Sequence, residues 1–294
     1  MGRRALRGTS RHPVDSGTAE LLPDGDLRDG WILLVDGTQQ SHVDLAHPDR
    51  LVFEYMRRIG HVIDLLPAGP VRAVHLGGGA MTLARYLSAT RPRSRNLVIE
   101  RDAALVELVR SALPWPRTHQ IRVRTADART ALESLPDAGA DLLVLDVFAS
   151  ARTPGNLTSI EAFGHAHRVV GPTGTLVANI ADEASLAYAR RYVAGVAATF
   201  DRVAVAAEPS TLRGRRFGNL IVVGQPASAP ALDIAVLTRR CASDPWPARL
   251  VHGPALAQFV AGARPYRDAD APGSPEPPPG MFGGNPPADP RAGI

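Results

Sequence analysis

Short apolar runs and amphipathic segments alternate along most of the chain. The apolar runs predict seven strands, at 71–76, 96–100, 121–125, 141–148, 174–180, 202–208 and 219–224. Apolar residues that recur every three or four positions predict helices, at 82–90, 103–113, 159–170, 182–200, 231–240 and 254–263. Strands that alternate with helices form a mostly parallel sheet covered on both faces, so the predicted fold is a doubly wound α/β sheet. Because no helix separates the last two strands, we expect one of them to run antiparallel at the sheet edge.

The segment before this region predicts a β-hairpin followed by a helix. Asp36-Gly37 is typical of a two-residue hairpin turn, and apolar residues at helical spacing follow over 50–66. After residue 267 the chain is rich in Pro and Gly and has almost no apolar residues, and the first residues are polar and Arg-rich. We therefore expect four parts: a disordered arm (1–27), the hairpin and helix (28–66), a Rossmann-like catalytic domain (67–265) and a disordered tail (266–294).

Composition excludes several functions. The net charge is +4, but every basic residue is Arg, these residues are dispersed and aromatic residues are only 5%, so we expect no nucleic-acid partner. The one cysteine, Cys241, excludes an internal disulfide and a thiolate cluster, and His165 and His167 are two residues apart on a helix, so we expect no metal. No apolar stretch of about 18 residues and no secretory signal are present, so we expect a cytoplasmic protein without membrane contact.

The turn after the first strand of the predicted sheet carries three consecutive glycines, Gly77, Gly78 and Gly79. In a doubly wound sheet ligands bind beyond the carboxyl ends of the strands, and the amides at a helix start favour a carboxylate or phosphate. The alternative is a flexible bend between a strand and a helix. Glu100 ends the second strand, where a carboxylate accepts hydrogen bonds from ribose hydroxyls or is simply a solvated acid.

The third and fourth strands also lead to acids. Asp127 follows the third strand, where it either accepts from an adenine amino group or caps the next helix. Asp146 emerges from the apolar run "LLVL", and an acid leaving a buried strand toward a cleft is a candidate for a perturbed pKa and a catalytic role. Together, the glycines and the three acids predict a ligand site on one rim of the sheet.

These residues resemble the class I methyltransferase-like Rossmann fold and, within it, the spermidine synthase (polyamine aminopropyltransferase) family, over about Ile32 to Gln225. "DGTQQ" matches the family's "DGxxQ" and implies Gln40 at the donor, "VIERD" implies Glu100 at the ribose, and "ADA" implies Asp127 at the adenine. The resemblance implies S-adenosylmethionine or its decarboxylated form as the donor, an amine or other nucleophilic small molecule as the acceptor, and Asp146 as base or amine anchor.

Other positions depart from the family's pattern. Where the family has "DSSDP", this chain has "DVFAS", so Ala149 replaces the second acid, and Ala80 replaces the acid that holds the donor amine. Phe53 and Glu54 stand where the family has Tyr and His. Burying a dication without carboxylates is costly, so we expect a polyamine half that is short of charge and binds diamines weakly. Without an acid at 80, S-adenosylmethionine becomes a credible donor.

Three functions therefore remain open: aminopropyl transfer to an amine, S-adenosylmethionine-dependent methyl transfer to a non-polyamine acceptor, and a non-catalytic nucleoside-binding scaffold. Phe148 and Asn179 are weaker candidates for the substrate pocket, and the helical spacing of Tyr55 favours a core aromatic. The unpaired edges of the N-terminal hairpin predict a homodimer.

Overall fold

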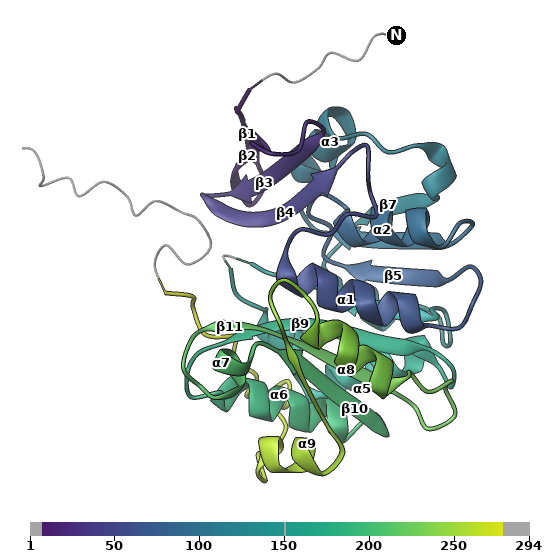
Figure 1. Cartoon of the computed structure of the whole chain (residues 1–294), viewed down its shortest axis with the longest axis vertical. Helices are drawn as coiled ribbons and strands as arrows, with labels where there is room; N and C mark the ends of the chain where they lie inside the picture. Colours follow the sequence, from purple (N-terminus) through teal and green to yellow (C-terminus); the bar gives the residue numbers. More distant parts are fainter. Residues whose placement is uncertain (1–7, 150, 279–294) are drawn as a thin grey trace, which may run out of the picture.

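The computed structural model describes residues 8–149 and 151–278, which form a large sheet flanked by helices and a small antiparallel sheet (Figure 1). The strands of the large sheet are β5 (Arg72–Leu76), β6 (Arg95–Glu100), β7 (Ile121–Thr125), β8 (Leu142–Leu145), β9 (Thr175–Asp182), β10 (Arg202–Ala207), β11 (Gly218–Gln225) and β12 (Arg249–His252). The helices are α1 (Glu54–Leu65), α2 (Thr82–Thr90), α3 (Ala103–Ala112), α4 (Ala128–Ser134), α5 (Ile160–Val170), α6 (Ala187–Ala197), α7 (Pro209–Leu212), α8 (Ile234–Ala242) and α9 (Gly253–Val260), with 3₁₀ turns η1 (Arg117–His119) and η2 (Gly155–Leu157).

The large sheet has the order β12-β10-β11-β9-β8-β5-β6-β7. Strands β5 to β9 are parallel, which confirms the doubly wound α/β class, and β11 runs antiparallel to both of its neighbours. Two details of the prediction are wrong. The antiparallel strand β11 lies inside the sheet rather than at its edge, and an eighth strand, β12, extends the sheet beyond β10. Strand β12 has only four residues, too few for a clear pattern.

Both faces of the sheet are covered, and this explains the unbroken apolar runs in its central strands. Residues 142–145 of β8 are all buried. Leu143 and Leu145 pack in one cluster with residues of α4, α5 and α6, whereas Leu142 and Val144 pack in another with residues of α1, α2 and α8. A strand that is buried on both sides is mostly apolar, and β8 carries no polar residue at all. The first polar position after β8 is Asp146, at the carboxyl end of the sheet.

The N-terminal residues form a sheet of four strands: β1 (Ser10–Val14), β2 (Gly17–Pro23), β3 (Gly30–Val35) and β4 (Thr38–Asp44). The predicted hairpin with its turn at Asp36-Gly37 is confirmed as β3–β4. The predicted disordered arm over 1–27 is wrong for residues 10–23, because Ala19 and Leu21 of β2 are fully buried against α2 and α3. Short antiparallel strands such as β1 and β2 become stable only when they pack against other elements in this way. Figure 1 shows the small sheet beside α2 and α3.

The predicted disordered tail over 266–294 is wrong for its first part. Tyr266 and Ser274 are buried, and the chain between them is hydrogen-bonded to the domain. Residues 279–294 lie outside the described residues. Among the residues that the structure describes, no helix has both the length and the apolar character needed to cross a membrane.

Candidate active site

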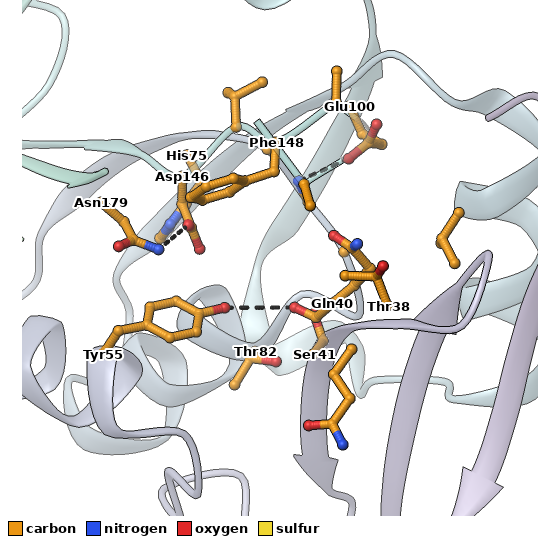
Figure 2. A pocket seen from close by; sticks show the side chains of 18 of the residues that line it. Thr38, Gln40, Ser41, Tyr55, His75, Thr82, Glu100, Asp146, Phe148 and Asn179 are labelled. Atoms are coloured by element: carbon orange, nitrogen blue, oxygen red, sulfur yellow. Dashed lines mark hydrogen bonds between the residues drawn. The ribbon is translucent and has the colours of Figure 1, made fainter. Parts of the chain in front are cut away.

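A cleft of about 1400 Å³ runs along the carboxyl ends of the central strands. Every candidate site residue from the sequence lines it, from the N-terminal sheet to β9: Gln40, Gly77, Gly78, Gly79, Glu100, Asp127, Asp146, Phe148 and Asn179. The predicted residues are therefore brought together along one rim rather than spread over separate surfaces. Figure 2 shows how several of their side chains converge.

The glycine turn holds its shape through close backbone approaches. Gly77 has φ +92°, and a Cβ there would lie 2.1 Å from the carbonyl oxygen of Asp146. Gly79 has φ +46°, and a Cβ there would lie 2.3 Å from Oγ of Ser41 on β4. Glycine is required at position 77, where a Cβ would meet the backbone of Asp146, whereas a Cβ at position 79 would displace the Ser41 hydroxyl. The turn thus contacts the end of β8 on one side and the N-terminal sheet on the other.

The carboxylate of Glu100 is held by two backbone amides. The N–H of Gly78 donates to its Oε2 at 2.9 Å, and the N–H of Asp102 donates to its Oε1 at 3.1 Å. Asp102 itself caps α3 by accepting from the N–H of Leu105 at 2.7 Å, and it also accepts from the N–H of Ser16 at 2.8 Å. Because each oxygen has spare lone pairs, Glu100 remains able to accept from ribose hydroxyls.

Asp127 serves as a cap and also faces the cleft. Its Oδ1 accepts from the backbone N–H of Thr130 at 3.0 Å, which makes it the N-cap of α4. The sequence presented the cap and the ligand contact as alternatives, but one side chain with two oxygens can provide both.

Asp146 lies just beyond β8 and is fixed at both its backbone and its side chain. Its N–H donates to the carbonyl of Leu76 at 2.9 Å, and its Oδ1 accepts from Nδ2 of Asn179 on β9 at 2.9 Å (Figure 2). Burial raises the pKa of Asp146 to about 6, and the Asn179 hydrogen bond opposes that rise. A carboxyl with this pKa is ionised at neutral pH yet basic enough to accept a proton.

Two further cleft residues escaped the sequence-based prediction. Tyr55 on α1 was expected in the core, but its hydroxyl lies 3.5 Å from the carbonyl oxygen of Gln40 and faces the cleft opposite Asp146 (Figure 2). Burial, together with nearby Asp146, raises the pKa of Tyr55 well above its ordinary value, so it stays a neutral donor. His75 on β5 is buried, with Nε2 2.9 Å from Oδ1 of Asn96. Burial lowers its pKa to about 4, so this imidazole is neutral at pH 7.

The part of the cleft around Asp146 contains more carboxylates than the sequence indicated. Glu54 and Glu208 line the same cleft as Asp146, and so does Arg216, which pairs with Glu208 at 3.1 Å. Ala149 also lines the cleft, and its methyl group adds no charge there. Sequence spacing could not reveal Glu208, because it follows β10 and reaches the site only through the position of that strand.

Ala80 has a different surrounding from the one that the motif implied. It is fully buried, its methyl group packs in the apolar cluster under the N-terminal sheet, and its N–H donates to Oγ of Ser41 at 3.1 Å. Arg85 on α2 also stabilises this turn, because its Nε donates to the carbonyl oxygen of Ala80 at 2.9 Å. Position 80 therefore supports the turn in this protein.

A cleft with a fixed carboxylate at a glycine turn and a weakly basic carboxyl opposite a hydroxyl can hold a nucleoside and assist a nucleophile that loses a proton.

Comparisons with protein-family models and with curated protein sequences found no match. Among solved structures, the chain is similar to a probable spermidine synthase from Corynebacterium glutamicum, with 37% identity and TM-score 0.81 over 88% of this chain and 96% of that one.

More distant structures share the fold. A spermidine synthase solved with the transition-state analogue AdoDATO has 13% identity and TM-score 0.58, and the match covers 80% of this chain and 78% of that one. Human methyltransferase-like protein 13, solved with SAH, has 19% identity and TM-score 0.52, with 74% and 96% covered. These two likenesses concern the fold alone, and they confirm its methyltransferase-like class.

Proposed function

Because the chain belongs to the spermidine synthase family of aminopropyltransferases, we propose that it transfers an aminopropyl group from an adenosyl sulfonium donor to an amine acceptor, with Asp146 as the base. The observation that carries this proposal is the position of the Asp146 carboxyl, with a pKa of about 6, in the same cleft as the glycine turn and Glu100.

The donor occupies the half of the cleft next to the N-terminal sheet. Glu100 accepts from the ribose hydroxyls, because its two oxygens are oriented by the amides of Gly78 and Asp102. Asp127 accepts from the adenine amino group, and Gln40 closes the donor site from β4. The glycine turn lets the backbone approach the ligand closely.

The acceptor amine lies between Asp146 and Tyr55. Its nitrogen attacks the aminopropyl carbon that is bonded to sulfur, the carbon–sulfur bond breaks, and the sulfonium becomes the neutral thioether of 5′-methylthioadenosine. The proton that the amine loses passes to the Asp146 carboxylate. Asn179 keeps this carboxylate in one orientation, and the Tyr55 hydroxyl aligns the amine. This alignment raises the rate, because the nitrogen must approach the carbon in line with the carbon–sulfur bond.

The second charge of a diamine is placed against Glu54. This residue lies one position before Tyr55 and lines the cleft, whereas Glu208 is already paired with Arg216. Glu54 thereby takes over part of the role that the missing acid at Ala149 has in the family. A buried ammonium with one carboxylate partner is held more weakly than one with two, so a monoamine competes well with a diamine.

A second function is favoured by one observation. Ala80 is packed in an apolar cluster, so no carboxylate from that position reaches the donor amine. With S-adenosylmethionine as the bound donor, the same cleft would transfer a methyl group to a nucleophile that Asp146 deprotonates.

Calorimetry and turnover separate these functions. Decarboxylated S-adenosylmethionine with putrescine should give 5′-methylthioadenosine at a rate that Asp146→Asn lowers at least about 100-fold. Tighter binding of S-adenosylmethionine, together with no product from putrescine, would instead support methyl transfer. Binding of 5′-methylthioadenosine with no binding or turnover of either sulfonium compound would contradict both functions and leave the nucleoside-binding scaffold.

A further inference from the structure

The last described part of the chain, residues 265–278, crosses the domain and ends at the cleft; we name it the C-terminal strap. Glu276, Pro277 and Pro278 line the cleft together with the loop that follows Asp146. A segment of this composition, with four prolines in its last seven residues, was expected to have no fixed place. Its contacts show the opposite.

The first half of the strap is anchored on α4, α5 and α6. The N–H of Ile160 donates to the carbonyl of Tyr266 at 2.9 Å, and the guanidinium of Arg191 stacks over the Tyr266 ring at 3.8 Å. Asp268 pairs with Arg129 at 2.7 Å. These contacts bury the aromatic ring and fix the direction in which the strap continues.

The second half of the strap is joined to the loop after Asp146. Ser274, which is fully buried, accepts from the N–H of Thr153 through Oγ at 2.9 Å and donates its own N–H to the carbonyl of Thr153 at 3.0 Å. Nε of Arg152 donates to the carbonyl of Ser274 at 2.6 Å. A Cβ on Gly155 would lie 2.3 Å from the carbonyl oxygen of Ala271, so the two backbones are in direct contact.

This loop forms one wall of the cleft, from Ala149 near Asp146 to Leu157, which packs in one cluster with Ala126 and Ala128 on either side of Asp127 in the proposed donor half. Apart from those to the strap, the backbone hydrogen bonds of the described residues of this loop are local: Ala149 and Arg152 bond to each other across a short turn, and the carbonyl of Pro154 accepts from the N–H of Leu157. We infer that the strap is a positioning element, which holds this wall in the donor-binding geometry so that donor affinity depends on residues about 120 positions away in sequence. The inference rests on the proposed function only in taking the cleft as the donor site.

The test compares a chain ending at Asp270, which keeps the anchors on α5 and α6, with a control chain ending at Pro278, which keeps the whole strap. Hydrogen exchange of the amides in 151–158 is measured first, because it needs neither donor nor acceptor. Loss of Ser274 should accelerate these amides at least about tenfold, with no change in β5 or β8. The Kd of 5′-methylthioadenosine should rise at least about fivefold, and the KM for the donor should change more than kcat does.

Ser274→Ala gives the same test in the full chain, should the shortened chain fold poorly, and Ser228→Ala is its control because Ser228 bonds only at the surface, to the carbonyl of Pro172. Unchanged exchange in 151–158 would overturn the inference, as would faster exchange with an unchanged Kd. Faster exchange in a protein that binds no adenosyl compound in any form would uphold the strap's hold on the loop and refute the proposed function instead.

Discussion

The two halves of the cleft differ in how their polar groups are satisfied. In the proposed donor half, Glu100 and Asp127 already accept backbone N–H groups, so their carboxylates are oriented before any ligand arrives. In the acceptor half, burial raises the pKa of Asp146 to about 6, and the buried Oδ1 of Asn179 has no hydrogen-bond partner among the described residues.

This difference separates recognition from chemistry. An oriented carboxylate binds hydroxyl groups with little loss of entropy, but it gains little from taking up a proton. A desolvated carboxyl is costly to the folded state, and that cost is what makes it a base. Substitutions in the donor half should therefore change binding, whereas those around Asp146 should change rate and pH dependence.

Asp146→Asn should have the largest effect. We expect kcat to fall about 10²- to 10⁴-fold, as for loss of a general base, with little change in the Kd of 5′-methylthioadenosine. The exposed Asp137, paired with Arg168 on the surface, gives the control Asp137→Asn, which should keep full activity. A donor affinity that fell as far as the rate would remove the distinction between the halves.

The same substitution should stabilise the fold above pH 6. The folded-state pKa of Asp146 lies above its ordinary value of 3.8, so the folded protein binds more protons between pH 4 and 6, and the free energy of unfolding falls as pH rises through this window. Asp146→Asn removes that loss. Its free energy of unfolding should therefore exceed that of the unsubstituted protein by about 1–3 kcal/mol at pH 8 and by almost nothing below pH 4. Denaturant melts at both pH values measure it.

Glu100→Gln tests the donor half. We expect the Kd of 5′-methylthioadenosine to rise about 10- to 100-fold while kcat at saturating donor changes little, because an amide cannot accept from both ribose hydroxyls as a carboxylate does. Glu107→Gln on α3 is the control, since this exposed carboxylate pairs with Arg110 on the surface. Loss of kcat with an unchanged Kd would assign Glu100 to the chemistry instead.

Glu54→Gln examines the acceptor half for charge recognition. We expect KM for putrescine to rise about tenfold and KM for a monoamine of similar length to change less than about twofold, because only the diamine has a second ammonium. Glu107→Gln is the control, because Glu107 is an exposed residue of α3 that pairs with Arg110. Equal effects on both amines would show that Glu54 does not read the second charge.

Asn179→Leu should give the smallest change. Without the Asn179 hydrogen bond, which lowers the pKa of Asp146, the acidic limb of the kcat/KM profile should move up from about pH 6 by roughly half to one pH unit. Initial rates between pH 5 and 8 measure the shift. A limb that stayed in place would mean that another group titrates.

The parallel core of the fold was predictable because its patterns are local. The helix predicted over 82–90 coincides with α2, and the strand ends at Glu100 and Asp146 were located well enough to assemble the cleft. Strands β1 and β12 and the strap were not predictable, because each is short or rich in Pro and is held by residues distant in sequence.

The candidate site followed from the sequence to the extent that strand ends must meet at one edge of a parallel sheet. Glu100, Asp127 and Asp146 are such residues. Tyr55 was assigned to the core because helical periodicity does not distinguish a buried face from a cleft face. Glu208 reaches the cleft because β10 runs in the same direction as β9, with the antiparallel β11 between them, a topology that spacing alone does not reveal. The predicted homodimer stays a prediction.

Gly77 joins the two halves, since its bare Cα faces the carbonyl of Asp146. Any side chain there would displace the carboxyl end of β8 and with it the base. Substitutions that adapt the protein to a different donor, in nature or in a selected library, should therefore occur at the rim of the cleft and not at position 77. When the codon for position 77 is fully randomised, the active variants should all have glycine there.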